Sequence, residues 1–204
     1  MEEIKEGQEI YRGRFSIIKK ALYRGDYAII KIPNIPPNAP TGQRELVCEI
    51  LLREFEIIKK LKEKGCSYII DILHPEPIIR EYPILIFEYC PKTLRDIIDY
   101  GIDEKTALDL IHKITIAIEC MHKQRIIHGD LKPENILIDI NDTPKIADFN
   151  AIPAREKGIK EFYTLEYAPP ELIEKEIIDE KTDVWQIGVI MYELIEKKAP
   201  IQSR

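Results

Sequence analysis

Three side chains with hard oxygen donors stand out near the middle of the sequence. Asp130 and Asn135 lie in the run His-Gly-Asp-Leu-Lys-Pro-Glu-Asn, and Asp148 follows beyond a predicted hairpin. Because a hairpin returns the chain on itself, the two carboxylates and the amide can converge on one point. Carboxylate and amide oxygens suit Mg²⁺, which commonly acts together with substrate phosphates. The spacing therefore indicates metal-assisted chemistry on a phosphate-bearing substrate.

The part of the chain before these residues is predicted to be rich in strands. β-branched and apolar runs predict strands at 10–13, 15–23, 27–32, 69–73 and 84–89. The first three runs predict a meander of hairpins. A proline-rich segment, 33–40, excludes helix and central strand, and apolar positions at helical spacing predict a helix over 44–63.

After residue 90 the pattern becomes helical. Thr93 and Asp96 are typical of a capped helix start, and Gly101 is the predicted end of that helix. Asp103 opens a long amphipathic helix with an apolar stripe that runs from Ala107 to Met121.

The last third of the chain contains a hairpin, a long loop and a final helix. The hairpin spans 136–147, and the segment 149–170 lacks periodicity, which is typical of a functional loop. A helix over 182–197 is predicted to bury one apolar side, and Trp185 is predicted to be a core residue. The predicted buried side consists of Val184, Ile187, Met191 and Leu194.

The composition limits the classes of protein to which this chain can belong. The 204 residues are 45% hydrophobic and carry a net charge of −6, which suits one large domain or two small lobes and argues against nucleic acid or an anionic membrane as the main partner. The first residues lack the basic start and apolar run of a signal peptide, and no apolar run approaches the ~18 residues of a membrane span. These features predict a cytoplasmic protein without a membrane partner. The abundance of Ile, Lys and Glu is typical of hyperthermophile proteins.

The four cysteines, Cys48, Cys66, Cys90 and Cys120, form no CxxC pair and have no histidine at metal-ligand spacing. This distribution favours reduced, buried thiols over zinc or a disulfide framework. A hyperthermophile source is the one context that favours intracellular disulfides.

Together these motifs resemble the protein-kinase superfamily, and the resemblance extends from about Ile10 to Leu194. It implies an α+β, bilobal fold in one domain over 1–204. The small lobe, about 1–89, would hold a five-stranded antiparallel sheet and one main helix. A hinge would lie at about 88–92, and the mainly helical large lobe, about 93–204, would lack the last helices.

The resemblance also implies a reaction, in which ATP and Mg²⁺ are used to phosphorylate a protein substrate. Asp130 matches the catalytic base that accepts the proton of the substrate hydroxyl. Asn135 and Asp148 match the ligands of the metal ions that bridge the ATP phosphates. Lys31 matches the lysine that contacts the α- and β-phosphates, and Glu54, preferred over Glu56, the acid that orients it.

Further positions match in the same way. Gly13 and Ile18 match the loop that covers the nucleotide, and Ile29 the residue above the adenine ring. Glu88 and Cys90 match the hinge residues whose backbones bind adenine. Lys132 and Thr164 match a pair typical of kinases that phosphorylate serine or threonine, and Asp183 matches the buried acid that anchors the catalytic loop.

The sequence departs from the family pattern at several glycines. Gly13 is the one glycine of three that remains in the nucleotide loop, and Ile29 is larger than the usual alanine. Gly129 replaces an arginine, for which Arg155 or Lys157 could substitute. Asn150 replaces a glycine, where it is expected to tolerate a left-handed turn.

Two other functions stay open at this point. A pseudokinase or interaction module is favoured by Ile29, the poor glycine loop and the missing last helices. In any of these readings, a regulatory protein could cover the large lobe. A small-molecule phosphotransferase shares His-Gly-Asp with this chain, although Lys132, Thr164 and the segment 169–171 favour a protein acceptor.

Overall fold

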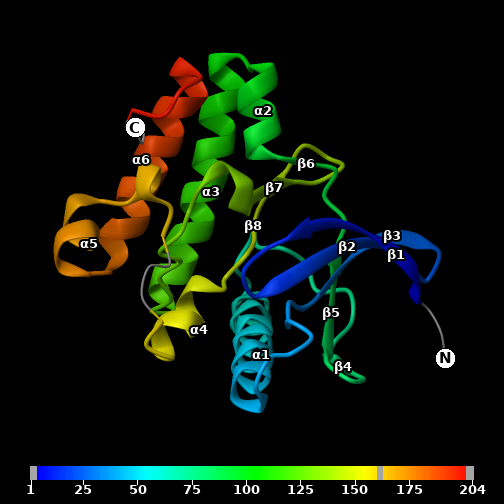
Figure 1. The fold of residues 1–204 in the computed structure, drawn as a ribbon. Helices are drawn as coiled ribbons and strands as arrows, with labels where there is room; N and C mark the ends of the chain where they lie inside the picture. Colours follow the sequence, from blue (N-terminus) through cyan, green and yellow to red (C-terminus); the bar gives the residue numbers. More distant parts are fainter. Residues whose placement is uncertain (1–3, 160–162, 201–204) are drawn as a thin grey trace. The chain divides into compact units, whose positions relative to one another are not determined.

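The computed structural model describes residues 4–159 and 163–200, which divide into two compact units. The first unit contains the chain up to Lys60 together with Ile70–Tyr89, and the second contains Leu61–Ile69 and the chain from Cys90 onward. Figure 1 shows the order of helices and strands along the chain. The fold is α+β, as the sequence predicts.

An antiparallel sheet forms the first unit together with one long helix. Its strands are β1 (Ile4–Arg12), β2 (Ser16–Tyr23), β3 (Asp26–Pro33), β4 (Ile78–Ile79) and β5 (Pro83–Glu88), in the order β1-β2-β3-β5-β4. Alternating residues of β2, β3 and β5 build a buried cluster of Ala21, Tyr23, Ala28, Ile30 and Ile86. The opposite face carries Ile29 and Lys31, because side chains alternate along a strand. Ile18 lies opposite Lys31 in the register of β2 and β3, so it shares that face.

The predicted strand over 69–73 is wrong. Ile69 forms an isolated bridge to Ile146, whereas Ile72 forms one to Phe87. Because the backbone changes partner within this short segment, it cannot make a continuous ladder, and β4 supplies the remaining strand of the sheet.

Helix α1 (Thr41–Glu63) begins three residues before the predicted start and directly follows the proline-rich segment. Its buried residues include Ile50, Leu51, Phe55 and Ile58, which recur at helical spacing on one side. This stripe fixes the rotation of α1 about its axis.

Helices dominate the second unit. Thr93 caps α2 (Leu94–Tyr100) in a capping box with Asp96, and Gly101 follows its last turn with a φ of 81°. Asp103 caps α3 (Glu104–Lys123). These starts and ends confirm the predicted signals. A small sheet is made of β6 (Lys92–Thr93), β7 (Ile136–Ile138) and β8 (Pro144–Ile146).

The segment predicted as a loop over 149–170 contains regular structure. Helix α4 (Ala151–Glu156) begins directly after Asn150, and a 3-10 helix, η2, spans Leu165–Tyr167. Because α4 has six residues, it is too short to show a helical period in the sequence. The helices α5 (Pro170–Lys175) and α6 (Glu180–Glu196) follow.

The prediction for the buried side of α6 is confirmed for Leu194, which is 3% exposed, and wrong for Val184 and Met191, and Trp185 is not a core residue. Val184 is 61% exposed, Trp185 39% and Met191 38%. The helix buries a stripe that contains Leu194 together with Thr182, Asp183, Gln186, Val189, Ile190 and Glu193. Polar side chains tolerate this burial because they hydrogen-bond to other segments of the second unit.

The expectation of four reduced cysteines is also wrong. Cys66 and Cys120 form a disulfide that links the segment after α1 to α3, whereas Cys48 and Cys90 remain thiols of intermediate exposure. The two cysteines lie 54 residues apart in the sequence, so their spacing did not indicate that they pair. Within residues 4–159 and 163–200, no helix combines the length and apolar character that crossing a membrane requires.

We predict that removing this disulfide destabilises the protein. A closed loop of 54 residues restricts the unfolded chain strongly, so the double variant Cys66→Ser/Cys120→Ser should lose about 2–4 kcal/mol in free energy of unfolding. Denaturant titration measures the change, and Cys48→Ser serves as the matched control that should behave like wild type. Equal unfolding midpoints for the double variant and wild type would contradict the prediction.

Candidate active site

The Asp130 carboxylate is the centre of a hydrogen-bond network in the second unit. Its Oδ1 accepts bonds from the Thr164 backbone N–H at 2.9 Å and from the Thr164 hydroxyl at 3.0 Å. The Lys132 Nζ donates to the Thr164 hydroxyl at 2.9 Å and lies 3.4 Å from Oδ2 of Asp130. Two other residues that the sequence singles out, Thr164 and Lys132, therefore surround the Asp130 carboxylate.

Burial raises the pKa of the Asp130 carboxyl above its usual value, and the positive charge of Lys132 partly offsets this effect. A raised pKa makes the carboxylate a stronger proton acceptor. The side chain is still 18% exposed, so a substrate group can reach it.

The backbone around Asp130 is held from α6. The Asp183 carboxylate, which is fully buried, accepts hydrogen bonds from the backbone N–H groups of His128 at 3.0 Å and Gly129 at 2.8 Å. One turn further along α6, Gln186 accepts from the Leu131 N–H at 2.8 Å and donates to the Gly129 carbonyl at 3.2 Å. Asp183 was predicted from the sequence, whereas Gln186 was missed although it lies one helical turn away.

Asn135 and Asp148 lie close together at one end of the small sheet. The Ala147 N–H donates to the Asn135 carbonyl at 2.9 Å, which continues the β7–β8 pairing and brings the next residue, Asp148, beside Asn135. The Asn135 amide nitrogen donates to the Asp130 carbonyl at 2.8 Å. Because the nitrogen is used in this bond, the amide oxygen is the atom suited to a metal.

These donors fit Mg²⁺ that arrives with a nucleotide. One carboxylate and one amide oxygen, completed by phosphate oxygens and water, are a usual set for Mg²⁺ at a phosphate-transfer site. Among the described residues, no group of three or more His, Cys, Asp or Glu side chains is arranged to hold a metal ion.

The residues after Asp148 differ from the expected turn. Asp148 itself has a φ of 64°, whereas Asn150 adopts a right-handed helical conformation and precedes α4. The expectation of a left-handed Asn150 is therefore wrong. Its amide nitrogen instead donates to the Asp148 carboxylate, so it contacts the predicted metal ligand directly. Phe149 packs against His128, with ring centroids 5.0 Å apart.

Lys31 and Glu54 form a buried ion pair within the first unit. The Lys31 Nζ donates to Glu54 Oε1 at 2.7 Å, and their side chains are 5% and 1% exposed. A buried pair of this kind fixes an ammonium group in one place, because moving it would separate two charges in a medium of low dielectric constant. The pair joins β3 to α1.

The remaining residues predicted to contact the nucleotide divide between the two units. Gly13 lies in the turn between β1 and β2, and Ile18 and Ile29 share the sheet face of Lys31. Glu88 ends β5, where its N–H donates to the Asp71 carbonyl at 3.0 Å. Cys90 is the first residue of the second unit after β5.

A polar network that the sequence did not reveal holds Tyr167 in place. Arg95 of α2 donates to Glu193 and Tyr167 at 2.7 Å each and to Glu134 at 2.8 Å. Burial alone would lower the pKa of Arg95, but the bonds to Glu193 and Glu134 outweigh it and raise the pKa. The four residues come from four segments, so no local pattern predicts the network.

Arg155 of α4 lies against Gly129. A Cβ atom at Gly129 would come within 2.7 Å of Arg155 Nη1, and Gly129 has a φ of 78°. Burial lowers the pKa of Arg155, and the charge of Asp183 partly offsets this. The guanidinium that the sequence suggested as a substitute therefore occupies the space beside Gly129.

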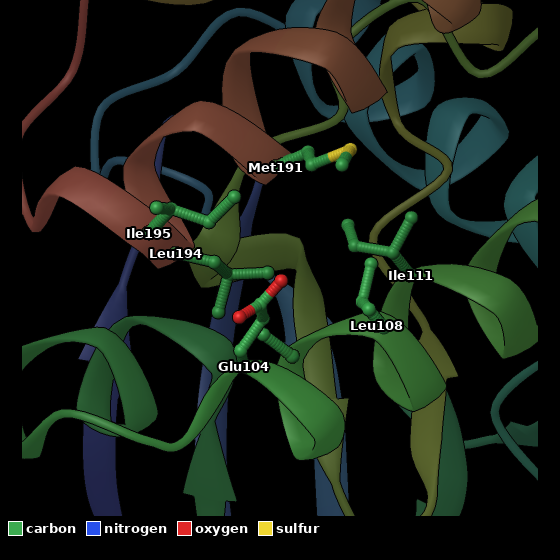
Figure 2. Close-up of a pocket in the computed structure, with 7 residues that line it drawn as sticks. Glu104, Leu108, Ile111, Met191, Leu194 and Ile195 are labelled. Carbon is green, nitrogen blue, oxygen red and sulfur yellow. The ribbon is translucent and has the colours of Figure 1, made fainter.

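A small pocket lies between α3 and α6, away from these residues. Figure 2 shows Leu108 and Ile111 from α3 facing Met191 and Ile195 from α6, with Glu104 at the same pocket. Leu108 is 48% exposed and Ile195 53% exposed. The pocket is thus the centre of an exposed apolar face.

Comparison with known proteins relates these features to one family. The family model described as protein kinase domain matches residues 4–204. The chain is similar to a probable myosin light chain kinase of Dictyostelium discoideum, with 33% identity over 97% of this chain and 51% of that protein.

Two further relatives are Aurora kinases. Aurora kinase B of Danio rerio is 29% identical over 97% of this chain and 61% of its own length, and Aurora kinase C of Mus musculus is 29% identical over 97% and 71%. The chain therefore spans 51% to 71% of the length of these curated relatives.

The contact between His122 and Asp183 predicts a pH-dependent stability. The His122 Nε2 lies 2.8 Å from Asp183, and this hydrogen bond raises the pKa of His122 above its usual 6.5. A raised pKa in the folded state means that the stabilisation is complete below about pH 6.5 and is lost as the pH rises through the folded-state value.

The free energy of unfolding, measured by denaturant titration between pH 5 and pH 9, should therefore fall with rising pH in the wild type more steeply than in His122→Gln. His112→Gln, at an exposed position of the same helix, is the control and should keep the wild-type slope. Equal slopes in wild type and His122→Gln would show that the contact does not contribute.

Proposed function

The chain belongs to the protein kinase domain family, and on that premise we propose that it transfers the γ-phosphoryl group of ATP to serine or threonine hydroxyls of protein substrates. The observation that carries the proposal is the network in which Lys132 and Thr164 surround the Asp130 carboxylate. Since that carboxylate has a raised pKa and some exposure, it suits the role of a general base.

Asp130 accepts the proton of the substrate hydroxyl in this proposal. The hydroxyl oxygen forms a bond to the γ-phosphorus as the bond to the β–γ bridging oxygen breaks, and ADP leaves. Thr164 holds the carboxylate in one orientation through two hydrogen bonds. Lys132 supplies positive charge at the same point, where charge on the transferring oxygens needs stabilisation.

Four further residues hold the nucleotide and the metal in this proposal. Lys31, oriented by Glu54, contacts the α- and β-phosphates, and Asn135 and Asp148 bind Mg²⁺. When bound, Mg²⁺ supplies divalent charge that neutralises the phosphate oxygens. The buried Lys31–Glu54 pair supports this assignment, because its geometry is fixed before a ligand arrives.

The preference for serine or threonine rests on Lys132 and Thr164. Their direct contact, at 2.9 Å, matches the pairing that the resemblance associates with these acceptors. The 3-10 helix η2 follows Thr164 directly, α5 begins shortly after it, and the Arg95 network fixes Tyr167, the last residue of η2. A rigid segment beside the base supports a peptide acceptor over a small molecule.

The proposal also includes a hinge, a cellular location, a type of source organism and a regulatory partner. Residues 88–92 would act as a hinge within a single kinase domain over 1–204, in the cytoplasm of a hyperthermophile. The Cys66–Cys120 disulfide supports the source, since intracellular disulfides occur in such organisms. A regulatory protein would cover the apolar face of α3 and α6, because an exposed contiguous apolar face is typical of interaction sites.

We predict that Asp130→Asn abolishes phosphoryl transfer while nucleotide binding persists. Loss of a general base should lower the initial rate on a generic protein substrate by about 10²–10⁴-fold. The Kd for Mg·ADP, measured by calorimetry, should stay within about twofold of wild type, since Asp130 binds the hydroxyl rather than the phosphates.

Asp142→Asn is the matched control, because Asp142 lies in the exposed turn between β7 and β8, at 82% side-chain exposure. A wild type that binds Mg·ADP but transfers no phosphate would instead support a pseudokinase. Phosphate that reaches only small hydroxyl compounds would support the small-molecule alternative.

A further inference from the structure

The turn between β1 and β2 contains one glycine, and its backbone is closed by internal hydrogen bonds. The Gly13 N–H donates to the Ser16 carbonyl at 2.8 Å. A Cβ atom at Gly13 would come within 2.9 Å of the Tyr11 ring, so this ring lies directly against the glycine. The turn is therefore compact although it lacks the other two glycines.

Asn34, the residue after β3, makes two hydrogen bonds to this turn and one to the end of β1. Its backbone N–H donates to the Phe15 carbonyl at 2.8 Å, and its side-chain Nδ2 donates to the Gly13 carbonyl at 2.7 Å. Its Oδ1 accepts from Nη1 of Arg12, the last residue of β1, at 3.1 Å. The half-buried amide thus uses its donor on the turn and its acceptor on the strand that precedes the turn.

Arg12 is held from its other side as well. Its Nε donates to Glu9 at 2.9 Å, and its Nη2 lies 2.6 Å from the second oxygen of the same carboxylate. The guanidinium therefore connects β1 to Asn34 in a defined orientation. Because surface ion pairs contribute little alone, the Asn34 amide is the side-chain contact that ties the turn to the segment after β3, beside the backbone bond to Phe15.

We propose that Asn34 is a positioning residue for the nucleotide, which holds the β1–β2 turn in one conformation through its side-chain amide. A turn with several glycines loses conformational entropy when it becomes ordered around a bound ligand, and this loss weakens binding. In this chain the order exists beforehand, so nucleotide affinity depends on the fraction of molecules in which the turn is held. The nucleotide part rests on the proposed function, whereas the contacts of Asn34 do not.

Two variants and one control test the role. Asn34→Ala removes both side-chain bonds, and Asn34→Asp keeps the acceptor for Arg12 but loses the donor to the Gly13 carbonyl. Asn38→Ala, at an exposed position of the same proline-rich segment, is the matched control. Thermal unfolding verifies that all three fold.

The first readout needs no nucleotide. Amide hydrogen exchange over residues 13–16 should be at least about fivefold faster in Asn34→Ala and Asn34→Asp than in wild type and Asn38→Ala, because each lost bond favours open conformations. Exchange elsewhere in the sheet should be unchanged.

The second readout separates binding from chemistry. The Kd for Mg·ADP and the KM for ATP should rise about 5–30-fold in both Asn34 variants, while kcat at saturating ATP stays within about threefold. A wild type that binds Mg·ADP and an Asn34→Ala variant that binds it equally well would overturn the role of Asn34 alone. A wild type that binds no nucleotide would overturn the proposed function and with it the nucleotide role, even if the exchange rates differ as expected.

Discussion

The buried carboxylate of Asp183 is the constraint on which the candidate site depends. A fully buried carboxylate is costly unless donors surround it, and here its donors are the His122 ring and the backbone N–H groups of His128 and Gly129. His128 and Gly129, which supply two of these donors, directly precede Asp130. Their hydrogen bonds to Asp183 therefore also fix the position of the backbone at Asp130.

Gln186 extends the same constraint past Asp130. Its amide satisfies the Leu131 N–H and the Gly129 carbonyl, so the backbone on both sides of the candidate base is bonded to one face of α6. Helix α6 therefore holds the backbone of residues 128–131 in place. Thr164 and Lys132 then complete the arrangement around the Asp130 carboxylate.

Two asparagines support loops in which expected glycines are missing, Asn150 from within its loop and Asn34 from the segment after β3, and each acts through its amide. Asn150 replaces a glycine and donates to the Asp148 carboxylate, which orients a predicted metal ligand. Asn34 bonds to the carbonyls of Gly13 and Phe15, which orders a turn that has lost two glycines. In both loops a side-chain hydrogen bond holds the backbone where the family pattern has a flexible glycine. The free protein therefore samples fewer loop conformations.

Local signals in the sequence predicted the fold where one interaction decides an element. The capping box of Thr93 and the N-cap of Asp103 are examples, because a side chain and a nearby N–H determine each helix start. The predictions failed for features that depend on contacts between residues far apart in the sequence. The buried side of α6 combines apolar residues with polar ones that hydrogen-bond to residues 128–131, so an apolar stripe alone was the wrong criterion for it.

The site shows the same division between local and distant determinants. Asp130, Asn135 and Asp148 were predicted from their spacing, and the structure brings Asn135 into contact with Asp130. The Arg95 network joins residues as far as 98 positions apart, so only tertiary structure reveals it. The Cys66–Cys120 disulfide was missed for the same reason.

Mapping of phosphorylated residues by mass spectrometry, after incubation of the wild-type protein and Asp130→Asn with Mg·ATP and a mixed protein substrate, tests the central claim most directly. If Asp130, held by Thr164 and by the backbone anchored to Asp183, is the base of a protein kinase, phosphate appears on serine and threonine with the wild type and disappears with the variant. Phosphate confined to tyrosine, or equal incorporation by both proteins, would contradict this account.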